Sequence, residues 1–237
     1  YHFVSSESAK ERVIKLGEDP SMVFNTGCPS IDLAKEVKNS KILPFDPYEK
    51  YGGVGAKPDL SNGYLVVMQH PVTTEYKDSR KHIEATLEAV YKLQKPTLWF
   101  WPNVDAGADG TSTGIRSFRE QHQLPNVHFF KNMEGQDFLQ LLQHSDCLIG
   151  NSSVGIRECA YLGVPVINIG SRQNRRERGG NSADVTYNQA QIEQAILAAM
   201  QSGKTKSSAI YGNGKAGLQI AELLLTLPLQ FHKTIMY

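Results

Sequence analysis

The chain has 237 residues, of which 40% are hydrophobic and 21% charged, so it can bury a substantial core and is unlike a disordered chain. Its 25 basic and 24 acidic residues are interspersed and give a net charge of +1, which argues against nucleic acid or a membrane surface as a partner and favours a small molecule. The three cysteines form no CxxC pair, so we expect neither zinc nor a redox centre, but a reducing, cytoplasmic setting. The sequence has no apolar run of membrane-spanning length, and its first residues lack the features of a signal peptide.

Residues 1–37 are interpreted as a separate piece in which strand and helix patterns alternate. The predicted strands are 3–5 and 22–25, and the predicted helices are 7–16 and a short one from 29. Because the chain begins without methionine and enters a strand at once, we expect it to be part of a larger protein. Residues 38–62 are rich in proline and glycine, and this composition predicts an interdomain linker.

From residue 63 to residue 213, short apolar runs alternate with amphipathic segments of helix length, which is the pattern of βα units on a parallel sheet. We therefore predict an α/β fold with a Rossmann-like, doubly wound parallel sheet. The predicted strands are 63–68, 97–101, 127–130, 147–149, 165–169 and one near 184–187. The predicted helices are 78–93, one within 112–123, 135–144, 152–162 and 189–201. A further amphipathic helix is predicted in the tail, 214–237.

Polar residues follow several of these strands, and beyond the carboxyl ends of parallel strands such residues converge on one crevice. The segment Gly150-Asn151-Ser152-Ser153 joins a strand directly to a predicted helix. Backbone N–H groups, the helix dipole and the hydroxyls of Ser152 and Ser153 would then face one point and suit a diphosphate. An ordinary serine cap without a ligand is the alternative. Glu158, in the second turn, could accept both hydroxyls of a ribose or could simply complement the helix dipole.

His70 and Asn103 each follow a predicted strand. Pro71 ends the first of these strands, so the His70 imidazole should project into the crevice. Near a diphosphate the pKa of His70 should rise and make it a cationic donor to a leaving group, the alternative being a locally bonded loop histidine. Asn103 and Asp105 precede a glycine-containing loop that could close over a ligand. Both also suit turns, and we assign a ligand role to Asn103 and a turn role to Asp105.

Arg172 lies in a loop with four arginines in seven residues, after the strand that ends near Asn168. Such a loop can bind RNA phosphates. A single loop without interleaved aromatic residues, on a nearly neutral chain, favours instead a phosphate or substrate loop or a solvated turn. The sequence contains no P-loop, HExxH or GxSxG motif and no GxGxxG after a strand.

At these residues the chain resembles the hydrolysing UDP-N-acetylglucosamine 2-epimerases, a family similar to bacterial sialic-acid-pathway enzymes and to the epimerase half of the animal bifunctional enzyme. The resemblance covers nearly the whole chain and is carried by specific motifs. They are QHPVTT (69–74), PNVDAG (102–107), IGNSS (149–153) with GIRE (155–158), and GVPVINIGSRQ (163–173), with shorter matches at FVS (3–5), GCPS (27–30) and YGNG (211–214).

The resemblance implies a GT-B-like fold of two Rossmann-like domains that face a cleft. This chain would supply the end of the N-terminal domain (1–37), the linker (38–62), the C-terminal nucleotide-binding domain (63–213) and a C-terminal helix (214–237). The resemblance also assigns roles in a UDP site: Ser152 and Ser153 to the diphosphate, Glu158 to the ribose, Asn103 and the region of Met133 to the uridine side, Arg172 to support of the nucleotide pocket, and His70 to the diphosphate and the reacting sugar.

The implied reaction eliminates UDP across C1 and C2 to give a 2-acetamidoglucal. Water then adds with inversion at C2 and gives N-acetylmannosamine and free UDP, in the biosynthesis of sialic acid or a related nonulosonate. The implied partners are a UDP-sugar, the absent N-terminal domain, which in the family supplies most acid/base carboxylates, and further copies in a homo-oligomer. No cofactor or metal is expected.

Because that N-terminal domain is absent, the chain alone should bind the nucleotide weakly and turn over little. The alternatives are a GT-B glycosyltransferase that uses a UDP-sugar, a non-catalytic nucleotide-sugar-binding module, and a non-hydrolysing epimerase. A 2,4-diacetamido-6-deoxy sugar nucleotide is the alternative substrate, since relatives act on it through the same motifs.

Overall fold

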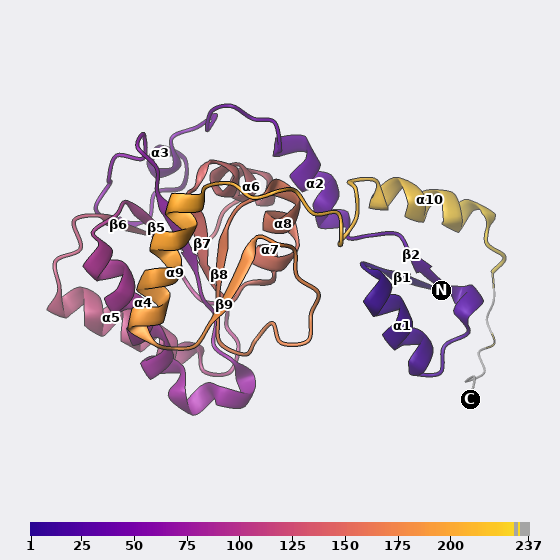
Figure 1. The fold of residues 1–237 in the computed structure, drawn as a ribbon, viewed down its shortest axis with the longest axis horizontal. Coiled ribbons are helices and arrows are strands. Elements are labelled where there is room, and N and C mark those ends of the chain that lie inside the picture. Colours follow the sequence, from indigo (N-terminus) through magenta and orange to yellow (C-terminus); the bar gives the residue numbers. More distant parts are fainter. Residues whose placement is uncertain (230–231, 233–237) are drawn as a thin grey trace.

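The structure, a computed structural model, describes residues 1–229 and residue 232. A large lobe is built on a seven-stranded sheet, and a small lobe on a pair of parallel strands lies beside it (Figure 1). Among the described residues, no helix combines the length and the apolar character needed to cross a membrane. The α/β class predicted from the sequence is confirmed.

The large sheet has the strand order of a doubly wound fold. Its strands are β3 (Val54–Gly55), β4 (Leu65–Met68), β5 (Thr97–Phe100), β6 (Val127–Phe130), β7 (Cys147–Gly150), β8 (Val166–Ile169) and β9 (Ser182–Val185). They lie in the order β3-β6-β5-β4-β7-β8-β9, and only β3 runs antiparallel to its neighbour. Without β3 this is the Rossmann order 3-2-1-4-5-6, which reverses its direction between β4 and β7. The carboxyl ends of these two strands therefore flank the place where such sheets bind ligands.

Helices cover both faces of this sheet. One face carries α2 (Pro29–Val37), α6 (Gly135–His144), α7 (Ser153–Ile156) and α8 (Glu158–Leu162), and the other carries α4 (Ser79–Leu93), α5 (Ala108–Gln121) and α9 (Gln189–Ser202). Successive strand residues alternate between the two cores, with Leu65 and Val67 in one and Val66 in the other. Burial on both faces explains why the strands are continuous apolar runs rather than alternating ones.

Two segments differ from their predictions. The single helix predicted over 152–162 is wrong, because it is divided at Arg157, whose φ of −106° and ψ of −80° are not helical. The predicted linker, 38–62, contains the helix α3 (Pro47–Tyr51) and the edge strand β3. His128 of β6 holds this segment, since its two ring nitrogens lie 2.6 Å from the Ala56 carbonyl oxygen and 2.8 Å from that of Gly52.

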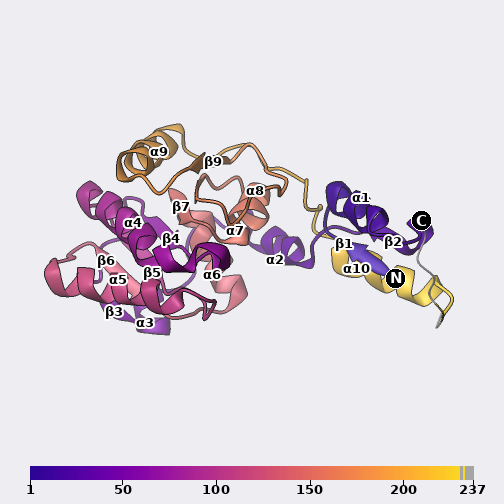
Figure 2. The ribbon, with the colours of Figure 1, turned by 90° about the horizontal axis from the view of Figure 1, so that it is seen from below.

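The small lobe contains β1 (His2–Val4), α1 (Glu7–Lys15), the 3₁₀ helix η1 (Pro20–Met22), β2 (Val23–Asn25) and α10 (Ala216–Thr226). The strand pair lies between α1 and α10 in both views (Figures 1 and 2). The chain thus returns to the small lobe after it has completed the large one. Beyond residue 229, the helix predicted over 214–237 lies outside the described residues except at residue 232.

The two connections between the lobes touch each other at glycines. The Cys28 N–H donates to the Tyr211 carbonyl at 2.8 Å, and a Cβ on Gly27 would lie 2.9 Å from the Cα of Gly212. Gly27 and Gly212 have positive φ angles of 80° and 115°, which residues other than glycine rarely adopt. A pocket of about 240 Å³ beside this crossing is lined by residues of both connections, including Asn25 and Asn213.

Asp32 of α2 fixes the start of α10, and its removal tests how α10 is held. Its carboxylate accepts hydrogen bonds from the N–H groups of Ala216 and Gly217 at 2.9 and 2.8 Å. The side chain of Lys215, at the N-cap position, makes no capping hydrogen bond to this helix. We predict that Asp32→Ala costs about 1–2 kcal/mol locally and speeds amide hydrogen exchange over 216–226. Glu36→Ala, on the same helix, is the control. Equal exchange in both variants would contradict the capping role.

Candidate functional site

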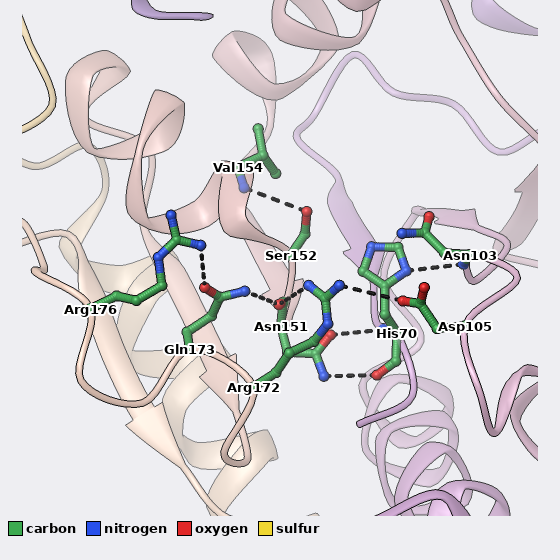
Figure 3. Close-up of polar contacts among 9 residues, drawn as sticks. All are labelled: His70, Asn103, Asp105, Asn151, Ser152, Val154, Arg172, Gln173 and Arg176. Atoms are coloured by element: carbon green, nitrogen blue, oxygen red, sulfur yellow. Dashed lines mark hydrogen bonds and ion pairs between the residues drawn. The ribbon is translucent and has the colours of Figure 1, made fainter. Parts of the chain in front are cut away.

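The side chain of Asn151 joins the loops that follow β4 and β7. Its Oδ1 accepts the backbone N–H of His70 at 2.7 Å, and its Nδ2 donates to the His70 carbonyl at 2.8 Å (Figure 3). The Asn151 carbonyl in turn accepts the Gln173 side-chain amide at 2.8 Å and the Arg172 guanidinium at 3.4 Å. One asparagine with 1% exposure therefore ties together the loops after β4, β7 and β8.

Gly150 allows the β7 loop to come this close. Its φ of 132° is unfavourable for other residues, and a Cβ there would overlap the carbonyl oxygen of Met68 on the neighbouring strand. The close approach lets the Asn151 N–H bond to the same carbonyl at 3.3 Å. A glycine at the last position of β7 is thus required to place Asn151 beside His70.

The hydrogen bonds of His70 define its tautomer. Its Nδ1 accepts the backbone N–H of Asn103 at 3.1 Å, so Nδ1 presents a lone pair and the neutral ring carries its proton on Nε2 (Figure 3). Burial, aided by the positive charge of Arg172, lowers the pKa of His70 from 6.5 to about 4. The sequence led us to expect a raised pKa and a cation. That rise refers to a bound diphosphate and stays a prediction, whereas within the protein alone burial and Arg172 outweigh Asp105 and lower the pKa.

Arg172 and Asp105 meet across the site. The guanidinium Nη2 lies 3.5 Å from Oδ2 of Asp105, while Nη1 contacts the Asn151 carbonyl (Figure 3). The Asp105 carbonyl also accepts the N–H of Ala108 at 2.9 Å at the start of α5. Asp105 therefore forms the predicted turn and, in addition, orients Arg172. Asn103 is bonded to His70 through its backbone N–H.

Ser152 and Glu158 lie beyond the same loop. Ser152 caps α7, where its Oγ accepts the Val154 N–H at 3.4 Å (Figure 3), and Ser153 begins the helix. Because α7 has only four residues, its dipole contributes less than a continuous helix over 152–162 would have. Glu158 is 5% exposed, and its Oε2 is buried without a hydrogen-bond partner in the described part of the chain. A buried carboxylate oxygen left in this way is suited to a ligand hydroxyl.

The remaining predicted residue, Met133, belongs to the apolar core. It follows β6, is 9% exposed, and packs in the core that contains α6. The structure thus joins His70, Asn103 and Arg172 by direct bonds or through Asn151. It places Ser152 and Ser153 next to Asn151, with Glu158 at the start of the next helix.

The arginine-rich loop is an ordered turn. Gln173 was not among the predicted site residues. It is 1% exposed, and its Oε1 accepts a hydrogen bond from Nη1 of Arg176 at 3.1 Å (Figure 3). Arg178 pairs with Asp184 at 2.9 Å, and the Arg175 carbonyl accepts a bond from Arg12 of the small lobe at 2.7 Å. No signal in the sequence marks Gln173, because a glutamine among arginines normally faces solvent. Asn151 could have been selected, since it begins the loop at the predicted switch point.

The chemistry of the site is asymmetric. Near Asn151 it presents donors, namely the Nε2–H of His70, the Arg172 guanidinium and the serine hydroxyls, and this set suits an anion with several oxygens. At Glu158 it presents an acceptor, which suits a hydroxyl group. Within residues 1–229 and 232, no group of three or more His, Cys, Asp and Glu side chains is placed to hold a metal ion.

Comparison with known proteins gives consistent matches. The sequence model of one family, described as UDP-N-acetylglucosamine 2-epimerase, matches residues 1–225. The chain is similar to a UDP-N,N'-diacetylbacillosamine 2-epimerase (hydrolyzing) of Legionella pneumophila, with 31% identity over 229 residues that cover 97% of this chain and 58% of the relative. It is also similar to a GDP/UDP-N,N'-diacetylbacillosamine 2-epimerase (hydrolyzing) of Campylobacter jejuni, with 32% identity over 190 residues that cover 79% and 47%. The chain thus spans about half the length of these relatives.

Solved structures share the fold. The UDP-GlcNAc 2-epimerase of Neisseria meningitidis, bound to UDP-GlcNAc, has a TM-score of 0.72 at 17% identity, over 96% of this chain and 62% of that one. The enzyme of Methanocaldococcus jannaschii, in complex with UDP-GlcNAc and UDP, has a TM-score of 0.67 at 17% identity, over 95% and 60%. These likenesses agree with the predicted Rossmann-like, GT-B-like fold class.

Removal of the Asn151 side chain tests its place in the site. Asn151→Ala leaves the buried N–H and carbonyl of His70 without partners, and we predict a loss of about 2–4 kcal/mol in the free energy of unfolding. Asn126→Ala is the control, because Asn126 also donates to a backbone carbonyl but lies away from the site. Urea unfolding measures both variants. Similar losses in the two would contradict a special role for Asn151.

The lowered pKa of His70 predicts how stability depends on pH. Its folded-state value of about 4 lies below the ordinary value of 6.5, so between these values the unfolded chain binds more protons. This residue therefore makes the free energy of unfolding fall as the pH drops from 6.5 towards 4, by at most about 1.4 kcal/mol per pH unit. His70→Asn should remove this part of the slope in urea unfolding at several pH values. An unchanged slope would show that His70 has the same pKa in the folded and in the unfolded protein.

Proposed function

The chain belongs to the UDP-N-acetylglucosamine 2-epimerase family, and we propose that its full-length protein is a hydrolysing 2-epimerase of a UDP-linked 2-acetamido sugar. The observation that carries the proposal is the set of donors at the switch point between β4 and β7, formed by His70, Arg172 and the serines after Asn151. The named activity of the Legionella and Campylobacter relatives supports the hydrolysing type. The activity is proposed for the full-length protein, since the chain spans only part of these relatives.

In this proposal the donors bind the diphosphate. Ser152 and Ser153 supply hydroxyls and the N–H groups that begin α7, and Arg172 supplies a positive charge. His70 acts as a neutral donor through Nε2–H, because its Nδ1 is committed to the N–H of Asn103. Negative charge grows on the diphosphate as the bond to C1 breaks, and prearranged donors stabilise that charge most in the transition state.

The rest of the nucleotide extends from this point. Glu158 accepts the ribose hydroxyls with the buried oxygen that otherwise has no partner among the described groups. Asn103 and the region of Met133 form the uridine side. The acceptor at Glu158 and the donors near Asn151 then match the hydroxyls and the diphosphate of one ligand.

Proton removal at C2 requires a base, and this chain offers few candidates. Asp105 pairs with Arg172, Glu158 lies beside Arg157, and Glu75 is bound by the Ser171 hydroxyl. We therefore assign the acid/base carboxylates to the N-terminal half of the full-length protein. Elimination would give the glycal and UDP, and addition of water would give the sugar with inverted C2.

Two UDP-linked sugars are the candidate substrates in this proposal. UDP-N-acetylglucosamine would give N-acetylmannosamine, on the way to sialic acid. The two relatives named for diacetylbacillosamine favour, as the second candidate, a 2,4-diacetamido-6-deoxy sugar of a related nonulosonate. We place the enzyme in the cytoplasm as a homo-oligomer. The three free cysteines, all buried, fit a reducing compartment.

The deciding experiment is an NMR time course of the full-length protein with each of the two UDP-sugars. Release of UDP together with the free 2-epimerised sugar is the expected result, and the faster substrate identifies the sugar. Formation of UDP-N-acetylmannosamine would overturn the hydrolysing type. UDP binding without turnover of either substrate would favour a glycosyltransferase or a binding module.

Glu158 provides a test of ribose recognition. We predict that Glu158→Gln weakens UDP binding about tenfold, because a hydrogen bond to a charged acceptor is weakened. Binding of inorganic diphosphate, which has no ribose, should stay unchanged. Calorimetric titration of both ligands measures this difference, with Glu177→Gln as the control. Equal weakening of both ligands would show that Glu158 does not contact the ribose.

A further inference from the structure

Glu75 is bound through both carboxylate oxygens to a distant part of the chain. It lies in the 3₁₀ helix η2 (Thr73–Asp78), which follows β4 and His70. Its Oε1 accepts the Ser171 hydroxyl, and its Oε2 accepts the Tyr187 hydroxyl at 3.3 Å. The Tyr187 ring stacks on His82 of α4, with 3.5 Å between ring centroids. Residues after β4, β8 and β9 therefore meet at one carboxylate, which we call the Glu75 clamp.

The clamp holds the turn from which Arg172 projects. Ser171 directly precedes Arg172, and Gly170 directly precedes Ser171. Gly170 has a φ of 74°, and a Cβ there would overlap the Tyr187 ring, so the backbone of this turn is packed closely against the clamp. Arg172 therefore follows one residue after the hydrogen bond at Ser171 and two residues after the close contact at Gly170.

Glu75 binds the two hydroxyls and lies 3.9 Å from Nδ1 of His82, whereas Arg172 pairs with Asp105. A glutamate beside an arginine-rich turn would ordinarily form an ion pair with it. Here the two hydroxyls occupy the carboxylate, and η2 departs from helical geometry at Glu75, where φ is −119° and ψ is 20°. The Arg172 guanidinium remains directed at Asn151 and Asp105, on the ligand side of the turn.

We propose that Glu75 is a positioning residue: by binding Ser171 and Tyr187 it holds the turn 170–172 so that Arg172 reaches the diphosphate. This inference rests on the proposed UDP site. Glu75 itself has no contact with the ligand in the proposal. Together with Asn151, it attaches the segment that carries His70 to the segment that carries Arg172 at two separate points.

The test compares Glu75→Ala and Glu75→Gln in the full-length protein, with and without Arg172→Ala. Calorimetry should show about tenfold weaker UDP binding for Glu75→Ala, because two hydrogen bonds to a charged group are lost. In the Arg172→Ala background the same change should have no further effect. Glu75→Gln keeps an acceptor for Ser171 and should restore most of the affinity. Glu84→Ala, which removes a glutamate paired with Arg80 on α4, should leave it unchanged.

A second measurement needs no nucleotide. Amide hydrogen exchange over 170–173 should become faster in Glu75→Ala and in Ser171→Ala but not in Glu84→Ala. If the wild type does not bind UDP, the proposed function fails, and the exchange measurement still decides whether Glu75 holds the turn. Unchanged exchange would overturn the inference. Equal loss of UDP affinity with and without Arg172 would overturn it as well, because Glu75 would then act on general stability.

Discussion

The two hydrogen bonds between the Asn151 side chain and the His70 backbone are the constraint on which the site depends. The connections after β4 and β7 leave the sheet where the strand order reverses, and His70 lies just beyond the last ladder pair, Met68 and Gly150. Asn151 supplies an acceptor and a donor to the same residue and so replaces the missing ladder bonds between the ends of β4 and β7. Its carbonyl extends this arrangement to Arg172 and Gln173.

This arrangement also explains the charge state of His70. A ring that accepts an N–H from the Asn103 backbone cannot be protonated at Nδ1 without breaking that bond, and its burial opposes the added charge. The positive charge of the site is left to Arg172, whose guanidinium keeps its proton at any ordinary pH. Neutral and charged donors are thus separated between two residues.

Much of the fold could be predicted from the sequence, because apolar runs and glycine or proline boundaries are local signals. Val127–Phe130 and Gly135–His144 occur as predicted. Features that depend on distant partners could not be predicted. The break at Arg157 has no proline to announce it, and the nearby Gly155 lies within α7. The strand β3 is only two residues long and becomes a strand through its pairing with β6. The residue types of the site were visible, whereas the bond from Asn103 that defines the His70 tautomer became evident only in three dimensions.

The crossing of Gly27 and Gly212 has a mechanical consequence. Two backbones without side chains touch there, and further bonds join the lobes, from Arg12 to the Arg175 carbonyl and from the start of α10 to Asp32. A rotation at this crossing would displace each part of the small lobe in proportion to its distance from the two glycines. The pocket lined by Asn25 and Asn213 lies beside the crossing and would move little. The bonds made by Arg12 and Asp32 therefore limit a rotation that the two glycines alone would allow, and the orientation of the small lobe depends on both.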